Sequence, residues 1–212
     1  MTLNPEPSHR HNAKQSLVNF STDTSREGLT PEKLFHALEL PFNPRLTRTT
    51  LRLEKFEDLN IDKISACIHG LILDVDGVMV SHHTNDFSPA VVEKLREIKA
   101  KMPAVVFSNN GEEREIFRQL GIPVVTKVAP KPDRSGFKVA IDMHLQNKHP
   151  NHPAIYPGQC AMVGDNFLTD GGCRKIGMKF IHVKPIPGSE KFMHRTTRKY
   201  GHLVSRFHDL FR

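Results

Sequence analysis

Apolar residues gather into short continuous runs from residue 71 onward, and a stretch with helical spacing follows most of these runs. Runs of about four to eight apolar residues bounded by turn residues are typical of strands buried on both faces. The sequence therefore predicts five strands, at 71–75, 104–108, 123–126, 160–164 and 179–183.

Helices are predicted between these strands and before the first of them. Pro31 follows Thr30 and Pro89 follows Ser88, which is the pattern of an N-cap and a first helical residue. Three more helices are expected over 112–120, 133–145 and 169–176. The apolar positions of the first two helices are Leu34, Phe35 and Leu38, and Val92, Leu95 and Ile98. Strands that alternate with helices in this way predict an α/β fold, a Rossmann-like doubly wound parallel sheet of about five strands.

The chain divides by pattern into four parts. Residues 1–28 are polar without a sustained period, which predicts a flexible N-terminal arm. A helix and a turn-rich connector are expected over 29–55, the α/β core over 56–193, and a basic amphipathic helix over 194–212. No stretch approaches the roughly 18 apolar residues of a membrane span.

Composition bounds the class of protein. Hydrophobic residues make up 38% and charged residues 25% of the chain, which suits a globular core. The absence of Trp argues against an aromatic platform for nucleic acids, so no nucleic-acid partner is required. Three scattered cysteines indicate a reducing compartment, and the N-terminus lacks a secretory core. We expect a cytoplasmic protein, with an organellar address left open.

Basic charge concentrates at the C-terminus. The net charge is +7, and residues 184–212 carry seven basic residues against two acidic ones. Tyr200, Leu203, Val204 and Phe207 recur at helical spacing among them. Such a helix can bind an anionic membrane surface as a peripheral contact, or it can pack its apolar stripe on the core. Both readings stay open.

Two carboxylates follow the first predicted strand of the core. Asp74 and Asp76 flank Val75 and precede Gly77, where the chain can turn sharply. In phosphoryl transfer one carboxylate can attack phosphorus while the other donates a proton to the leaving oxygen. Taken alone, the same run could be a calcium-loop fragment or a plain turn.

Further polar residues follow the other predicted strands. Asp165 and Asp170 come after the fourth strand, and acids of this kind suit Mg²⁺. Asp170 could equally be a helix-capping acid. Ser108, followed by Asn109 and Asn110, could form an anion cradle at a helix N-terminus or serve as a simple N-cap.

Lys131 lies between two prolines in a loop. A lysine there could balance developing phosphoryl charge, or it could be an exposed loop residue. Because ligands of such sheets bind at the carboxyl ends of the strands, we expect Asp74, Ser108 and Asp165 to converge on one edge.

In their order, these motifs resemble the haloacid dehalogenase superfamily. The likeness rests on LILDVDGVMV, VVFSNNGEER, the segment from LGIPVV to APKP, and VGDNFLTDGGCRKIGMKFIHVKP, and it runs from about residue 56 to the C-terminus. Within the superfamily the chain looks most similar to subfamily IIIA proteins related to phosphatidylglycerophosphate phosphatases. The resemblance implies a Mg²⁺-dependent phosphatase acting through an aspartyl-phosphate.

The resemblance also assigns roles to residues. It makes Asp74 the nucleophile, Asp76 the general acid and base, and Lys131 the residue that balances charge. Ser108 would bind the phosphoryl oxygens beside Asn109 and Asn110. The metal ligands would be Asp74, Asp76 through its carbonyl, Asp165 and Asp170.

The gaps between the motifs bear on the substrate. They hold one helix and one strand each, so we expect no cap domain over the site. An open site favours a substrate whose bulk stays outside, such as a phospholipid. A soluble phosphate ester, a phosphoprotein or a nucleic-acid end is the alternative within the same reaction class, and a non-enzymatic binding module is the alternative outside it. A zinc site at His144, His149 and His152 fits no strong pattern and is disfavoured.

Overall fold

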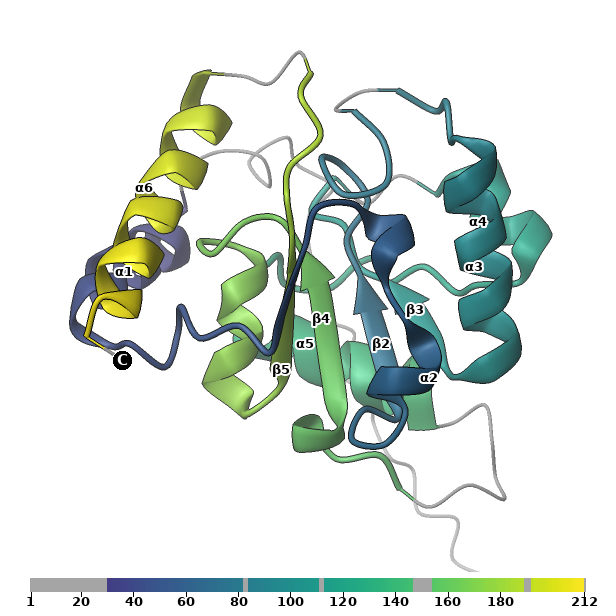
Figure 1. Ribbon diagram of the computed structural model, residues 1–212. Helices are drawn as coiled ribbons and strands as arrows, with labels where there is room; N and C mark the ends of the chain where they lie inside the picture. Colours follow the sequence, from purple (N-terminus) through teal and green to yellow (C-terminus); the bar gives the residue numbers. More distant parts are fainter. Residues whose placement is uncertain (1–29, 82–83, 111–112, 147–153, 189–191, 212) are drawn as a thin grey trace, which may run out of the picture.

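The computed structural model describes residues 30–81, 84–110, 113–146, 154–188 and 192–211. Five parallel strands form one sheet in the order β1-β5-β4-β2-β3. The strands are β1 (Leu51–Leu53), β2 (Gly70–Leu73), β3 (Ala104–Val106), β4 (Cys160–Gly164) and β5 (Lys179–Val183). Figure 1 shows the four labelled strands, β2 to β5, side by side with helices around them. The predicted parallel α/β sheet of five strands is confirmed.

One of the five strands differs from the prediction. Residues 123–126 do not form a strand, because they pair with β3 only through an isolated bridge between Val106 and Val124. The fifth strand is instead β1, which lies in the segment expected to be a connector and pairs with β5 at the opposite edge of the sheet.

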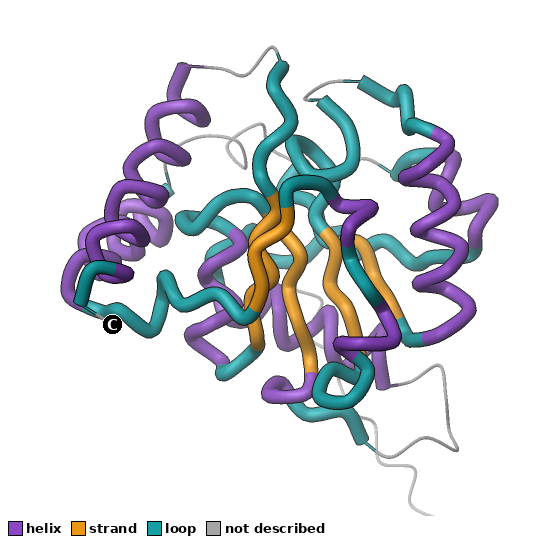
Figure 2. Tube along the Cα trace, in the orientation of Figure 1, coloured by secondary structure: helices purple, strands orange, loops and turns teal. Residues whose placement is uncertain are grey.

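Two hydrophobic layers cover the sheet. Alternate strand residues such as Leu71 and Leu73 face a layer built on α2 (Ile61–Ile64), α3 (Pro89–Lys101) and α4 (Glu115–Leu120). Ile72 between them faces the layer built on α5 (Arg134–Ala140) and η6 (Asp170–Ile176). This alternation is the period of two that a strand imposes, and it makes the sheet doubly wound. Figure 2 shows helices on both sides of the strands.

The first residues of the helices were predicted more accurately than their buried faces. Ser88 accepts a hydrogen bond from the N–H of Val91 and Pro89 follows it, so α3 begins as expected. Its buried residues are Val91, Leu95 and Ile98, so Val91 takes the place in the core that the sequence assigned to Val92. The helix expected from residue 112 begins at Glu115 as α4.

The remaining elements are short or terminal. The helix expected over 133–145 is α5 followed by a π-helical segment, η4, and the one expected over 169–176 is the 3₁₀ segment η6. The bounds are α1 (Pro31–Glu39), η2 (Leu40–Phe42), η3 (Phe56–Asp58), η4 (Ile141–Gln146), η5 (Pro157–Gln159) and α6 (Phe192–Asp209). The N-terminal arm over 1–28 and the histidines at 149 and 152 lie outside the described residues.

Helices α1 and α6 lie beside each other at the β1 edge of the molecule (Figure 1). The Tyr200 hydroxyl of α6 donates to the carbonyl of Ala37, and a ring nitrogen of His208 contacts the carbonyl of Pro41. Toward the core, α6 buries Val204 and Ser205. Part of α6 thus packs on the domain.

The predicted apolar stripe of α6 is divided between the core and solvent. Leu203 and Phe207 point outward while Val204 is buried. On α1 the predicted apolar face is itself exposed, since Leu34 and Phe35 are accessible and Lys33 and His36 are buried. None of the helices that the structure describes combines the length and hydropathy of a membrane span.

Candidate active site

The carboxyl ends of β2 and β4 meet at the centre of the sheet. The chain crosses from β3 on one side of β2 to β4 on the other, so the gap between β2 and β4 is the topological switch point. Asp74 directly follows β2, and its N–H donates to the carbonyl of Val163 in β4 at 2.9 Å. Asp165 directly follows β4. The switch point therefore places two acids from distant parts of the sequence side by side.

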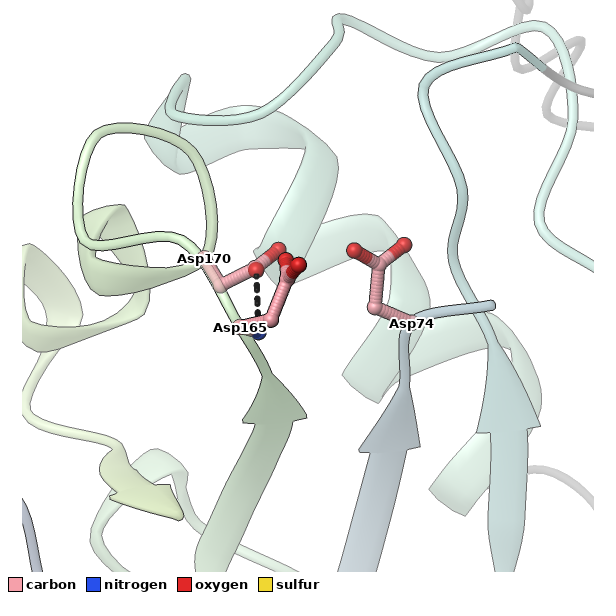
Figure 3. Close-up of side chains that lie close together, drawn as sticks. All are labelled: Asp74, Asp165 and Asp170. Carbon is pink, nitrogen blue, oxygen red and sulfur yellow. Dashed lines mark hydrogen bonds between the residues drawn. The ribbon is translucent and has the colours of Figure 1, made fainter. Parts of the chain in front are cut away.

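A third acid completes a buried cluster. Asp74, Asp165 and Asp170 each offer an oxygen, and these oxygens lie within 4.8 Å of one another. Figure 3 shows the three carboxylates at the ends of the strands. Asp170 is held by the backbone N–H groups of Asp165 and Asn166, at 3.1 and 3.0 Å from Oδ2.

Gly164 makes room for this acid cluster. A Cβ atom built there would lie 2.4 Å from Cγ and Oδ2 of Asp170, far inside van der Waals contact. A glycine before Asp165 is therefore required by the position of Asp170, five residues further along the chain.

Lys131 joins the cluster from its proline-flanked loop. Its Nζ lies 2.8 Å from Oδ1 of Asp74 and 2.6 Å from Oδ1 of Asp170, and its side chain is almost fully buried. The exposed-loop alternative for Lys131 is therefore wrong. Asn109 holds this loop, because its amide donates to the carbonyl of Lys131 and accepts from the N–H of the same residue.

The electrostatics of the cluster follow from its burial. Burial and, to a smaller extent, the neighbouring Asp170 raise the pKa of Asp74 to about 7, although Lys131 acts in the opposite direction. Burial likewise raises the pKa of Asp165 well above its usual range. Burial lowers the pKa of Lys131, but the attraction of Asp170 and Asp74 outweighs this and the net shift is upward.

These acids fit a hard cation. All three donors are carboxylate oxygens, and Oδ2 of Asp165 is buried without a hydrogen-bond partner. Arg198 lies 2.8 Å from that oxygen as an ion pair, without the alignment of a hydrogen bond. A bound Mg²⁺ would stabilise the ionised form of these carboxylates and would take the unpaired oxygen as a ligand.

The second acid of the DxDG run is held apart from the cluster. Gly77 has φ of 81° and its N–H bonds to the carbonyl of Val80, so the loop turns tightly after Asp76. Oδ1 of Asp76 lies 2.6 Å from a guanidinium nitrogen of Arg114, and Oδ2 accepts from the amide of Asn110 at 2.8 Å. The carboxylate is only slightly exposed.

Ser108 is linked to the same network. Its hydroxyl donates to Oδ1 of Asn110 at 2.9 Å. The helix that was expected to supply an anion cradle directly after these residues starts only at Glu115, so the described contacts of Ser108 are those of the loop. The site thus has two linked halves, one around Asp74 and one around Asp76.

Two arginines were missed by the reading of the sequence. Arg114 holds Asp76, donates to the carbonyl of Thr84 at 2.8 Å and lies over the ring of Phe87. Arg198 reaches Asp165 from α6, a helix that was assigned to membrane or core packing. Arg114 ends the VVFSNNGEER segment, but that segment gave it no role, and Arg198 lies in a polar stretch of a kind that is common on surfaces.

Comparison with known proteins supports one family. Comparisons with curated proteins and with solved structures give no match. A family model described as mitochondrial PGP phosphatase matches residues 33–176. The match begins before the core expected from the sequence and includes α1 and β1, and its description agrees with the organellar alternative. Because it spans more than half of the chain, the protein belongs to the mitochondrial PGP phosphatase family and is a phosphatase that hydrolyses phosphate monoesters.

Proposed function

We propose that this phosphatase forms an aspartyl-phosphate on Asp74 and needs Mg²⁺ to do so. The observation that carries the proposal is the buried cluster of Asp74, Asp165 and Asp170 with Lys131 between two of the acids. In this cluster Asp74 lies close to one cationic side chain and to two further acids. A nucleophile that works beside a metal ion is expected to have such surroundings.

In the proposed reaction, Asp74 attacks phosphorus and the bond to the leaving oxygen breaks. Asp76 donates its proton to that oxygen, and then takes a proton from the water that hydrolyses the aspartyl-phosphate. Lys131 balances the charge of Asp74 and of the phosphoryl group, and Ser108 and Asn110 would turn from their contacts with each other and with Asp76 to bind phosphoryl oxygens. Asp74, Asp165, Asp170 and the carbonyl of Asp76 would hold Mg²⁺, which would supply further positive charge at the phosphoryl oxygens.

Hydrolysis of p-nitrophenyl phosphate by the purified protein tests this chemistry. We expect activity with Mg²⁺, loss of activity with EDTA, and at least about a 10³-fold loss in Asp74→Asn, since removing a nucleophile removes the covalent route. After a rapid acid quench with labelled substrate, wild-type protein should retain label that hydroxylamine releases. Undiminished turnover in Asp74→Asn, or in the absence of any metal, would overturn the proposal.

The proposed substrate is a phosphate monoester of a phospholipid, met at an anionic membrane surface. Among the described residues, most large hydrophobic side chains that are exposed lie on the adjacent α1–η2 and α6 segments. We call this set the α1–α6 apolar face; it consists of Leu34, Phe35, Leu38, Phe42, Leu203, Phe207, Leu210 and Phe211, which are 47–87% exposed. Lys199 and Arg206 are exposed on the same helix α6. Apolar side chains bordered by basic ones are complementary to an anionic bilayer.

Sedimentation with vesicles tests the surface. The double variant Leu203→Glu/Phe207→Glu should bind less to vesicles that contain anionic lipid, while Met143→Glu, which changes an exposed apolar residue elsewhere, should bind as wild type does. Activity on p-nitrophenyl phosphate should be unaffected in both. Equal binding of all three proteins would remove the membrane from the proposal, and a preference for soluble phosphate esters over phospholipid would point to the soluble alternative.

A further inference from the structure

A cavity lined by basic residues lies beside the acid cluster. This cavity of about 650 Å³ opens between α6 and the segment that follows β5. Its lining on α6 consists of four basic residues and two others, and the opposite wall is made of Pro185, Pro187 and Gly188. The α6 residues are Arg195, Arg198, Lys199, His202, Leu203 and Arg206. None of the described residues that line the cavity is acidic.

The field in this cavity is positive, as its lining suggests. Burial lowers the pKa of His202, and the charges of Arg198, Arg52 and Arg206 lower it further. A neutral imidazole adds no charge of its own but can donate one hydrogen bond. The cavity therefore offers four cations and a neutral donor to whatever enters it.

Arg198 connects this cavity to the reaction site. Arg198 is a lining residue of the cavity, its guanidinium lies 2.8 Å from Oδ2 of Asp165, and the residue is largely buried. Asp165 in turn belongs to the cluster that contains Asp74. A group bound in the cavity is therefore separated from the acid cluster by a single side chain.

We propose that this cavity binds a second phosphate of the substrate, one that is not hydrolysed. Guanidinium groups recognise phosphate oxygens through paired hydrogen bonds, and several cations are needed to offset the desolvation of a phosphate. The substrate class that fits both sites carries a phosphate monoester for Asp74 and a phosphodiester a few bonds away. This inference rests on the proposed function, because it takes the acid cluster as the site of hydrolysis.

Selectivity between two substrates tests the cavity. The triple variant Arg195→Ala/Lys199→Ala/Arg206→Ala removes three cations but keeps Arg198, which contacts Asp165. The matched control Arg96→Ala/Arg134→Ala/Lys138→Ala removes the same residue types from exposed positions away from the cavity. The substrates are glycerol 3-phosphate and short-chain phosphatidylglycerophosphate, used below its micellar concentration so that membrane binding plays no part.

We expect the cavity variant to lower kcat/KM for the short-chain lipid about 10- to 100-fold, mainly through KM, because a charge-assisted phosphate contact is worth about 1.5–3 kcal/mol. Its kcat/KM for glycerol 3-phosphate and all values of the control variant should stay near wild type. Equal losses on both substrates, or no loss on the lipid, would overturn the inference.

Direct binding separates this inference from the proposed function. Glycerophosphoglycerol, a soluble phosphodiester without a monoester, should bind wild-type protein and Asp74→Asn alike in a calorimetric titration, and should bind the cavity variant at least about tenfold more weakly, as one lost contact predicts. This holds even if Asp74 is not the nucleophile. Inorganic phosphate serves as the second probe; if it alone binds, the cavity is a general anion site and the assignment to a phosphodiester is wrong.

Discussion

Arg114 should control protonation of the leaving group, although the sequence assigned no role to this last residue of the VVFSNNGEER segment. Its guanidinium is 2.6 Å from Oδ1 of Asp76, and its position is fixed by the carbonyl of Thr84 and the ring of Phe87. The change Arg114→Met keeps most of the buried volume and removes the charged contact. Asp76 then keeps only the amide of Asn110 as a described partner.

The magnitude follows from the contact that is lost. As Asp76 gives up its proton it becomes a carboxylate, which the guanidinium stabilises more strongly than it does the protonated acid. A hydrogen bond to a charged group is worth about 1.5–3 kcal/mol, and each 1.36 kcal/mol in the barrier is a factor of ten in rate. We therefore expect Arg114→Met to lower kcat/KM by about 10- to 150-fold for a substrate whose leaving oxygen must be protonated by Asp76. This loss should not exceed that of Asp76→Asn, which removes the general acid itself and should lower the rate about 10²- to 10⁴-fold.

Two substrates isolate this step. The alkoxide that leaves glycerol 3-phosphate needs a proton, whereas p-nitrophenolate leaves without one. In the proposed reaction kcat/KM reports steps up to formation of the aspartyl-phosphate, so hydrolysis of that intermediate does not mask the effect. Arg114→Met should thus lower kcat/KM for glycerol 3-phosphate strongly and for p-nitrophenyl phosphate much less.

Equal losses on the two substrates would refute this reasoning, because they would mean that Arg114 supports the whole site instead of one proton transfer. Thermal denaturation gives the needed control, since Arg114 also donates to Thr84. Arg114→Lys should recover only part of the activity, because a single ammonium cannot reproduce the two contacts of the guanidinium fork.

Two further predictions concern Gly164 and His36. Gly164→Ala should displace Asp170 and weaken Mg²⁺ binding in a calorimetric titration, and it should cost about 1–3 kcal/mol of stability because the site is overpacked. Gly158→Ala is the control: a Cβ there meets nothing within 4 Å, so neither Mg²⁺ binding nor stability should change. Burial, with Lys175 nearby, lowers the pKa of His36 to about 4, so the folded state keeps a neutral ring while the unfolded chain takes up a proton near pH 6.5. Stability from His36 is therefore complete above pH 6.5 and is lost as the pH falls toward 4, about 2 kcal/mol of it by pH 5. Urea unfolding at pH 7.5 and 5 should show a smaller loss in His36→Gln, which can still donate to the carbonyl of Phe167, and an equal loss would contradict the assignment.

The position of the acid cluster could be predicted because it depends only on strand order and strand ends. Asp74 and Asp165 follow fully buried strands, and adjacent parallel strands place their carboxyl ends at one edge. These two strands could be predicted without any knowledge of side-chain packing. Lys131 and Asp170 then followed from motif order, and the structure brings both into contact with each other.

Edge strands and helix faces were harder to predict for a physical reason. Strand β1 has three residues, pairs on one side only and alternates apolar residues with Arg52, so it lacks the continuous apolar run of the central strands. The segment 123–126 has such a run but ends the sheet with a single bridge. Val91 and Val92 are adjacent apolar residues, and only the angle at which α3 packs decides which of them is buried.

Arg198 shows how substrate choice can be coupled to the chemistry of the family. The family match ends at residue 176, and every acid of the cluster and Lys131 lie within it. Helix α6 lies beyond the match, yet it supplies the ion pair to Asp165 and the four basic lining residues of the cavity. Together with the two residues that follow it, α6 also supplies half of the α1–α6 apolar face. In the proposed function, the residues that hydrolyse the phosphate and the residues that select the substrate therefore lie in different parts of the chain. Arg198 pairs with Asp165 of the acid cluster and is also a lining residue of the cavity. If the cavity binds a phosphate as proposed, that phosphate would act on the same residue that faces Asp165, so substrate recognition and catalysis would be coupled through one side chain.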